Sequence, residues 1–347
     1  MASRPSIQRG LFAGALVAAA GLLAGCAAPA PEPTATDPVE YERATVRLAL
    51  HFNSPQASWV GIYVAEEEGY YDELGIDLDI QYLGGSTLAV QAVGSGQADI
   101  GLAAPDSLLA AFEQEIPLVA VANHIQQDST GVIVNGEAES FEDLAGLRVA
   151  TAQGTAESGM FQAALATADV ADDVTIDYVE SAAKCTMVIS GNADACTGFA
   201  YSQFVQLQLA GLEPSFLPFS TDEAPLPGHM IFATEKFVAD SGDVVARFLE
   251  ATFRGYAAAD ADRANAFEVI SALATTADPA QLERATDLVL DLTHSDRTEE
   301  FGWGYITEEV WQNLIDALTA GGVIDADLDP SEFFTNDLLP AGAADWR

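Results

Sequence analysis

The chain alternates between two hydrophobic periods along most of its length. Residues 45–50 (TVRLAL) and 76–83 (IDLDIQYL) place apolar side chains at every second position, which is typical of strands. Residues 58–75 between them have apolar positions at helical spacing, and Gly75 ends that helix. Similar alternation of strand and helix continues to about residue 235. The pattern predicts an α/β fold with mostly parallel sheets and helices on both faces.

The alternation restarts once, after the segment SFEDLAG, and gives way to helical periodicity alone near the C-terminal third. The part expected to fold is about 300 residues, which is more than one compact core usually holds. We therefore predict a first lobe from residues 44–125 and 230–347 and a second lobe from residues 126–229. Two segments, near residues 121–134 and 226–233, would then cross between the lobes and form a hinge.

The N-terminal segment has a different composition and is excluded from the predicted fold. Two arginines precede an apolar run that is too short to span a bilayer comfortably and that ends at Cys26. Its last residues, LLAGC, resemble a bacterial lipobox, which implies a signal peptide over residues 1–25 and a lipid on the Cys26 thiol. An ordinary signal peptide with a chance cysteine is the alternative. Residues 26–43, rich in Pro and Ala, predict an extended tether. We expect an extracytoplasmic protein that this lipid anchors to the outer face of the cell membrane.

The charge of the chain limits its partners. It has 13 basic and 53 acidic residues, for a net charge of −40, and its only lysines are Lys184 and Lys236. Such a surface repels phosphate backbones, so nucleic acid is not an expected partner. Most of the acidic side chains are expected to form a solvated outer face, which bears on solubility rather than on fold.

Six segments, taken in order, resemble one known family. They are GIYVAEEEGYYDELGIDLDI, VGSGQADIGLAAPDSLLA, IPLVAVANHIQQDSTGVIV, FEDLAGLRVATAQGT, GNADACTGF and PGHMIFATEKFV. Together they are similar to the periplasmic or lipid-anchored binding proteins of ABC importers, in the group for thiamine-pyrimidine precursors, riboflavin, taurine, alkanesulfonates and nitrate. The resemblance covers nearly all of the mature chain.

The resemblance implies a two-lobe periplasmic-binding-protein fold (type II) with a ligand cleft between the lobes. It also implies a small-molecule ligand and two partners, an ABC permease and its ATPase, and we expect the protein itself to be a monomer. Within the group, residues 124–134 and 227–237 look most like the members that bind thiamine pyrimidines or flavins. A binder of taurine, alkanesulfonate or nitrate is the alternative.

Candidate ligand contacts follow the strands, because ligands of open α/β sheets bind beyond the carboxyl ends of strands. Aromatic rings can stack on a flat heterocycle, although Trp59 can instead be core packing at a helix start. The Gly-Gly-Ser-Thr turn can present backbone N–H groups, and in sulfonate and nitrate binders the resemblance makes this loop an anion contact. Asp106 can accept hydrogen bonds from an exocyclic amine or cap its helix. The first-lobe candidates are Phe52, Asn53, Trp59, Gly84, Gly85, Ser86, Thr87, Asp106, Ser107 and His124.

The second lobe repeats this arrangement. The segment AQGTAES places polar residues between a strand and a helix N-terminus, and GFAYSQF places aromatic rings at another strand end. His124 and His229 lie near the two predicted crossings and are candidates for a neutral heterocycle or for satisfied hinge histidines. The remaining candidates are Gln153, Thr155, Phe199, Tyr201, Gln203 and His229. Lobe closure would place a ligand between the two aromatic walls.

Two other classes of function are alternatives to a binding protein. The fold group includes a fungal pyridoxal-phosphate-dependent synthase of the thiamine pyrimidine, which has a Lys and a His four residues apart and a dense cysteine cluster. Here those positions are Ala103, Ser107 and the segment PGHMI, so the chain has no lysine there for a Schiff base. Hydrolase, phosphate-loop and zinc-helix motifs are also absent from the sequence, and we expect no catalysis, no cofactor and no metal. A structural or adhesive lipoprotein is the third class, and it predicts no deep cleft.

Two cysteines remain after Cys26 is assigned to the lipid. Cys185 and Cys196 are separated by the turn SGNADA, and outside the cytoplasm such a pair can form a disulfide. Zinc would need more ligands than the sequence offers nearby. We predict a structural disulfide, with free buried thiols as the alternative.

Overall fold

The computed structural model describes residues 41–324 and 328–341. The predicted signal peptide, the candidate lipidation site Cys26 and most of the predicted tether lie outside these described residues. Within them, no helix is both long enough and apolar enough to cross a membrane.

The last residues of the predicted tether contact the folded chain. Arg43 forms an ion pair with Asp72 at 2.7 Å, and the guanidinium of Arg247 lies 5.2 Å from the centroid of the Tyr41 ring. These residues are followed directly by the first strand. The compact unit therefore starts at Tyr41, a few residues earlier than the composition indicates.

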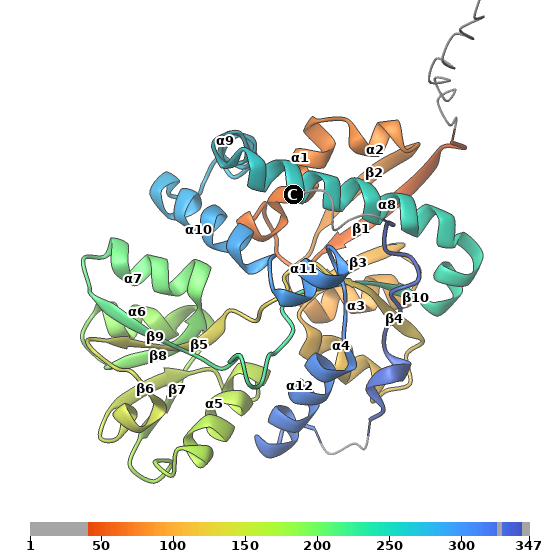
Figure 1. The fold of residues 1–347 in the computed structure, drawn as a ribbon. Helices are drawn as coiled ribbons and strands as arrows, with labels where there is room; N and C mark the ends of the chain where they lie inside the picture. The colour runs from red at the N-terminus through yellow and green to blue at the C-terminus, as the bar shows by residue number, and fades with distance from the viewer. Residues whose placement is uncertain (1–40, 325–327, 342–347) are drawn as a thin grey trace, which may run out of the picture. The chain divides into compact units, whose positions relative to one another are not determined.

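The first sheet contains five strands in the order β2-β1-β3-β10-β4 (Figure 1). β1 pairs in parallel with β2 and β3, whereas β10 is antiparallel to β3 and β4. The late strand β10 thus lies between two strands that are more than a hundred residues earlier in the chain. The strands are β1 (Ala44–Leu50), β2 (Ile76–Tyr82), β3 (Ile100–Ala103), β4 (Leu118–Asn123) and β10 (Met230–Thr234).

The second sheet also contains five strands, in the order β7-β6-β8-β5-β9. β6 pairs in parallel with β7 and β8, and β5 is antiparallel to β8 and β9. Its strands are β5 (Thr130–Asn135), β6 (Arg148–Thr151), β7 (Thr175–Tyr178), β8 (Ala195–Phe199) and β9 (Pro214–Pro218). We refer to the first sheet with its helices as the first lobe and to the second sheet with α5, α6 and α7 as the second lobe.

Both sheets are mixed, but four of the five strands in each described sheet share one direction, in agreement with the expectation of mostly parallel sheets. In each sheet one strand runs against its two neighbours: β10 in the first and β5 in the second. These two strands directly follow the segments that cross between the lobes. Strand direction follows from the path by which the chain returns to a sheet, and hydrophobic periodicity does not encode that path.

Helices surround both sheets (Figure 1). The predicted helix over residues 58–75 is broken at Gly69, whose φ of +75° lies in the left-handed region that favours glycine. A π-helical turn over Ala200–Phe204 precedes α7. The first-lobe helices are α1 (Val60–Glu67), α2 (Tyr70–Glu73), α3 (Ser86–Gly94), α4 (Pro105–Phe112), α8 (Glu235–Ala261), α9 (Arg263–Leu273), α10 (Pro279–Leu292), α11 (Asp296–Phe301) and α12 (Glu308–Ala320); the second-lobe helices are α5 (Ala156–Thr167), α6 (Lys184–Ile189) and α7 (Val205–Leu209).

Strand β1 shows how the helices position the site. Its side chains Val46, Leu48 and Leu50 are fully buried in the cluster that contains α1 and α8, while Ala49 is buried on the opposite face with α3 and α4. Burial of one such aliphatic side chain stabilises the fold by about 1.5–3 kcal/mol. Both faces of the sheet are therefore covered, and the open positions are at its strand ends.

Two segments cross between the lobes and are hydrogen-bonded to each other. The backbone N–H of Asp128 donates to the carbonyl of Leu226 at 3.0 Å, and that of Ile125 donates to the carbonyl of His229 at 3.4 Å. A Cβ on Gly228 would lie 2.4 Å from the carbonyl oxygen of Ile125, so only glycine allows this approach. The two segments thus form one narrow connection.

Gln126 anchors the first crossing segment to the C-terminal helices. Its side-chain Nε2 donates to the carbonyl of Asn123 at 2.6 Å, and its Oε1 accepts from Arg297 Nε at 3.3 Å. Arg297 Nη2 also donates to the Gln126 carbonyl at 2.6 Å. This buried amide is therefore used to position the connection.

Candidate functional site

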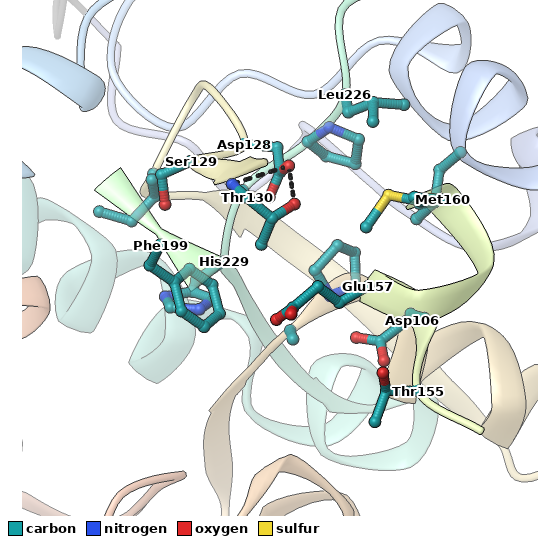
Figure 2. Close-up of a pocket in the computed structure, with 17 residues that line it drawn as sticks. Asp106, Asp128, Ser129, Thr130, Thr155, Glu157, Met160, Phe199, Leu226 and His229 are labelled. Atoms are coloured by element: carbon teal, nitrogen blue, oxygen red, sulfur yellow. Dashed lines mark hydrogen bonds between the residues drawn. The ribbon is translucent and has the colours of Figure 1, made fainter. Parts of the chain in front are cut away.

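A cavity of about 180 Å³ lies where the two lobes and the two crossing segments meet (Figure 2). Its wall includes the start of α4 from the first lobe and the start of α5 from the second lobe. The lining residues are Ala104, Pro105, Asp106, Ile125, Asp128, Ser129, Thr130, Thr155, Ala156, Glu157, Met160, Phe199, Leu226, Pro227, Gly228, His229 and Leu314.

Two helix N-termini contribute polar groups to this cavity. α4 begins with Pro105 at its first turn, followed by Asp106, and its N-cap residue makes no side-chain hydrogen bond. α5 begins after Thr155, whose hydroxyl accepts from the backbone N–H of Ser158 at 3.1 Å. Acidic side chains are favoured in a first helical turn because of the helix dipole. Local helix chemistry therefore explains why carboxylates occur at both helix starts.

Three carboxylates line the cavity: those of Asp106, Asp128 and Glu157, while no lysine or arginine does. The Asp128 carboxylate accepts from the backbone N–H of Thr130 at 3.1 Å and from the hydroxyl of the same residue. Burial nevertheless raises the pKa of Asp128 to about 6, and burial also raises the pKa of Asp106. The cavity is thus an acidic environment.

Glu157 has a cationic partner behind the cavity wall. The Lys184 ammonium, from the start of α6, forms an ion pair with the Glu157 carboxylate and lies 3.5 Å from the hydroxyl of Thr197. Only 4% of the Lys184 side chain is exposed. This pair fixes the first turn of α5 against α6 and neutralises one of the three carboxylates.

A cluster of three buried histidines lies beside the cavity. His229 lines it, and its ring centroid is 4.5 Å from that of His51 and 6.0 Å from that of His124. Burial lowers the pKa of His229 to about 4 and lowers the pKa values of His51 and His124 well below their ordinary value. All three rings are therefore neutral at pH 7. His51 uses Nδ1–H to donate to the carbonyl of Leu102 at 3.0 Å.

Aromatic rings lie on both sides of this histidine cluster. Phe199, at the end of β8, lines the cavity, and its ring centroid is 6.4 Å from that of His229. Trp59 and Tyr201 are buried in the first-lobe core, and neither lines the cavity. Tyr201 comes from the second-lobe π-helical turn, so its burial joins the two lobes. Phe199 is thus the aromatic side chain best placed to contact a bound ring.

The structure brings four of the sixteen predicted ligand contacts to the cavity: Asp106, Thr155, Phe199 and His229. A second pocket of about 370 Å³ shares Asp106 and Thr155 with it and is also lined by Thr87 and Ser107. Asp106 lines both pockets, and its carboxylate accepts hydrogen bonds from the backbone N–H groups of Asp106 and Ser107 at the start of α4. The remaining candidates line neither pocket: Phe52, Asn53, Trp59, Gly84, Gly85, Ser86, His124, Gln153, Tyr201 and Gln203.

Some of those remaining candidates have local hydrogen bonds. The Ser86 hydroxyl accepts from the backbone N–H of Ala104 at 3.1 Å, and Gln203 Oε1 accepts from the backbone N–H of Phe199 at 2.9 Å. These bonds hold the α4 start and the β8 end in place. Ser86 and Gln203 therefore support two cavity walls from outside.

Sequence reasoning missed Asp128, Ser129, Thr130 and Glu157 in this cavity. Glu157 lies in the segment AQGTAES, where an acidic residue in the first turn of a helix is ordinary. Asp128 lies in the crossing segment, four residues after the candidate His124. Position in the sequence could have indicated both residues, because each carboxylate lies close to a predicted strand end or a predicted crossing.

No group of three or more His, Cys, Asp or Glu side chains within the described part of the chain is arranged to hold a metal ion. Cys185 and Cys196 are joined in the structure, with their Cα atoms 5.3 Å apart. Cys185 lies on α6 and Cys196 on β8, and neither lines the cavity. The cysteine segment therefore belongs to the second-lobe scaffold.

The fold and the interlobe cavity define the class of the protein. Two mixed sheets linked by crossing segments form the periplasmic-binding-protein fold. The alkanesulfonate-binding protein SsuA of Xanthomonas axonopodis pv. citri, solved with MOPS, aligns with a TM-score of 0.63 at 15% identity, over 85% of this chain and 99% of that one. The predicted two-lobe α/β fold is thus confirmed.

Sequence comparison then gives the family. The family profile described as NMT1/THI5 like matches residues 56–266, and the chain belongs to that family. It is 24% identical to the riboflavin-binding protein RibY of Chloroflexus aurantiacus, over 93% of this chain and 95% of that protein. It is 26% identical to the formylaminopyrimidine-binding protein of Halalkalibacterium halodurans, over 64% of this chain and 68% of that protein.

A third relative is an enzyme by name and matches less of the chain. The 4-amino-5-hydroxymethyl-2-methylpyrimidine phosphate synthase THI12 of Saccharomyces cerevisiae is 29% identical over 44% of this chain and 46% of that enzyme. Relatives named as binding proteins thus align over a larger share of the chain than this synthase does.

Proposed function

We propose that the protein is the extracytoplasmic solute-binding component of an ABC importer and captures a small nitrogen heterocycle by closure of its two lobes. The observation that carries this proposal is the cavity itself, because both lobes and both crossing segments contribute to its wall. A ligand that contacts both lobes binds the closed arrangement more tightly than the open one, which is the requirement for capture by closure. The names of the binding-protein relatives support the same role.

The lining groups suit a single ring that carries N–H donors. Phe199 and His229 supply flat ring faces, and the carboxylates of Asp106 and Glu157 accept hydrogen bonds. The volume of about 180 Å³ is below the roughly 300–1,000 Å³ of pockets for drug-sized ligands. An aminopyrimidine therefore fits this proposal better than the three fused rings of a flavin, and its substituents can extend past Asp106 toward the second pocket.

The alternative of a sulfonate or nitrate binder is not favoured by this cavity. An anion would face three carboxylates without a lysine or arginine in the lining. The nearby cation, Lys184, already pairs with Glu157. Like charges at such short range disfavour binding, and burial strengthens the effect.

The two other classes of function are less well supported. A structural or adhesive lipoprotein does not require an interlobe cavity with converging polar groups. A synthase that holds pyridoxal phosphate as a Schiff base requires a lysine at its site, and the described cavity lining has none. We therefore propose a binding protein rather than an enzyme.

The remaining parts of the proposal concern location and partners. We propose that Cys26 carries a lipid after removal of residues 1–25, and that a permease and an ATPase receive the ligand. The lipobox-like segment supports the anchor. Mass spectrometry of the purified membrane form tests it: an acylated N-terminal peptide starting at Cys26 is expected, and an unmodified N-terminus further along the chain would contradict it.

Thermal unfolding of the soluble form tests the binding function. A ligand that binds the native state alone raises the midpoint of unfolding. We expect stabilisation by 4-amino-5-hydroxymethyl-2-methylpyrimidine or its formylamino counterpart and none by taurine or methanesulfonate. Phe199→Ala should weaken the pyrimidine effect, whereas Phe204→Ala, outside the cavity lining, is the matched control. Stabilisation by the sulfonates alone would contradict the proposal.

A further inference from the structure

The charges around the cavity do not balance. Three carboxylates line it, and one buried ammonium, that of Lys184, pairs with Glu157. The Asp128 carboxylate has two hydrogen bonds from Thr130 but no ion pair among the described residues. Asp106 likewise makes no ion pair in the part of the chain that the structure describes. Two carboxylates at a half-buried site therefore lack a cationic partner.

The histidine in the lining bears on the same charge balance. His229 is only 6% exposed, lines the cavity, and has no hydrogen-bond partner for Nδ1 among the described residues. Nδ1 itself is inaccessible, so His229 contributes a neutral ring to the cavity wall and adds no cation to it. The lining carboxylates are therefore the acceptors that a ligand N–H can reach.

We propose that the ligand of this cavity is a cation, a heterocycle with a protonated amine on a short arm, and that the amine is bound between Asp106 of the first lobe and Glu157 of the second. This inference rests on the proposed binding function and adds the charge of the ligand. Figure 2 shows Asp106 and Glu157 on the same side of the cavity, with Asp128 beside Thr130 farther away.

The position of the two carboxylates links charge to lobe closure. Asp106 is in the first turn of α4 and Glu157 in the first turn of α5, so an ammonium between them contacts both lobes. In the closed site the carboxylates lose water, and without a counterion that loss opposes closure. A cationic ligand supplies the counterion, whereas a neutral analogue of the same shape does not.

A matched pair of ligands separates this inference from the proposed function. We would compare 4-amino-5-hydroxymethyl-2-methylpyrimidine, which is neutral on its arm, with the 5-aminomethyl compound, which is protonated there at neutral pH. Isothermal titration at about 0.15 M salt limits the long-range attraction that a net charge of −40 exerts on any cation. We expect the aminomethyl compound to bind at least about tenfold more tightly.

Variants of the lining carboxylates test which residues bind the amine. Asp106→Asn should reduce the affinity for the aminomethyl compound about tenfold and change that for the hydroxymethyl compound much less. Glu157→Gln should act in the same direction, and because it leaves Lys184 without its partner, its folding must be verified by a cooperative unfolding transition. Glu283→Gln removes one exposed charge from α10, at a residue that lines neither pocket, and is the control, with no change expected.

The outcomes are distinct. A preference for the aminomethyl compound that Asp106→Asn abolishes and Glu283→Gln preserves supports the inference. Equal or tighter binding of the hydroxymethyl compound overturns the inference but leaves the binding function in place. Binding of neither compound, by a wild-type protein that unfolds cooperatively, overturns the inference together with the proposed pyrimidine ligand.

Discussion

Lys184 and Glu157 form an ion pair that joins α6 to the first turn of α5, with 4% and 13% of their side chains exposed. Lys184 is one of two lysines in the chain, and it lies immediately before Cys185. The pair holds a carboxylate at the cavity wall while its counterion stays behind that wall. In the segment that contains the two cysteines, Lys184 is therefore the residue that helps to position a group of the cavity wall.

Replacement of Lys184 by methionine should destabilise the protein by about 2–4 kcal/mol, because it leaves the Glu157 carboxylate buried without a partner. Urea unfolding measures this change. The double variant Lys184→Met with Glu157→Gln should recover part of the loss, since it removes the uncompensated charge as well. Equal stability of wild type and Lys184→Met would show that the pair does not hold α5 in solution.

The bond between Cys185 and Cys196 closes a loop across a sequence separation of 11 residues. A cross-link over so short a loop should contribute roughly 2–3 kcal/mol by restricting the unfolded chain. Mass spectrometry of the protein exported from the cytoplasm, with and without reductant, should show two fewer hydrogens before reduction. The Cys185→Ser, Cys196→Ser variant should unfold at lower urea. Two free thiols in the exported protein would contradict the disulfide prediction.

The histidine cluster should make stability depend on pH. The native-state pKa values of His51, His124 and His229 are lowered, so the unfolded state binds more protons below the unfolded pKa of about 6.5. The stability that the neutral histidines contribute is fully present above that pH and is lost as the pH falls toward about 4. Each histidine should contribute a loss of about 0.8 kcal/mol between pH 7.5 and pH 6.

Asp128 opposes this trend at lower pH. Its pKa is raised to about 6, so the native state takes up its proton first and gains stability as pH falls through that value. At pH 6 the histidines outweigh it, and we expect a net loss of about 2 kcal/mol relative to pH 7.5. Urea unfolding at both values measures the difference, which His124→Gln should reduce by about 0.8 kcal/mol. Stability that is constant or higher at pH 6 would contradict buried, neutral histidines.

Gly228 should not tolerate a side chain. The Cβ of an alanine there would lie 2.4 Å from the Ile125 carbonyl oxygen, so the two crossing segments would have to separate. We expect Gly228→Ala to destabilise the protein by about 1–3 kcal/mol and to weaken ligand binding, since both segments line the cavity. Gly242→Ala, where the new Cβ would meet only the Leu338 side chain at an ordinary 3.5 Å, is the control for loss of a glycine. Unchanged ligand affinity in Gly228→Ala would show that close contact between the two crossing segments is not needed for ligand binding.

Much of the fold could be predicted from the sequence because its local signals agree. Alternation at β1 and helical spacing in α1 are both fixed by which side chains are buried. The direction of β5 and β10 could not be predicted, because it depends on pairing between segments more than sixty residues apart. Local patterns carry no information about such pairings.

The site was predictable where a residue's role follows from its place at a strand end. Asp106, Thr155 and Phe199 were proposed in this way, whereas His229 was proposed from its place near a crossing, and all four line the cavity. Trp59 follows a strand too, but it is fully buried in the first-lobe core, which only packing reveals. Glu157 was missed for the opposite reason, since an exposed and a cavity-lining acid look the same in a first helical turn.

A crystal structure of the protein with its tightest-binding aminopyrimidine tests the central claim most directly. The account predicts the ring against Phe199 and His229, with the amine within hydrogen-bond distance of the Asp106 or Glu157 carboxylate and both lobes in contact with the ligand. A ligand bound to one lobe alone, or bound elsewhere with these carboxylates facing only protein and solvent, would contradict it.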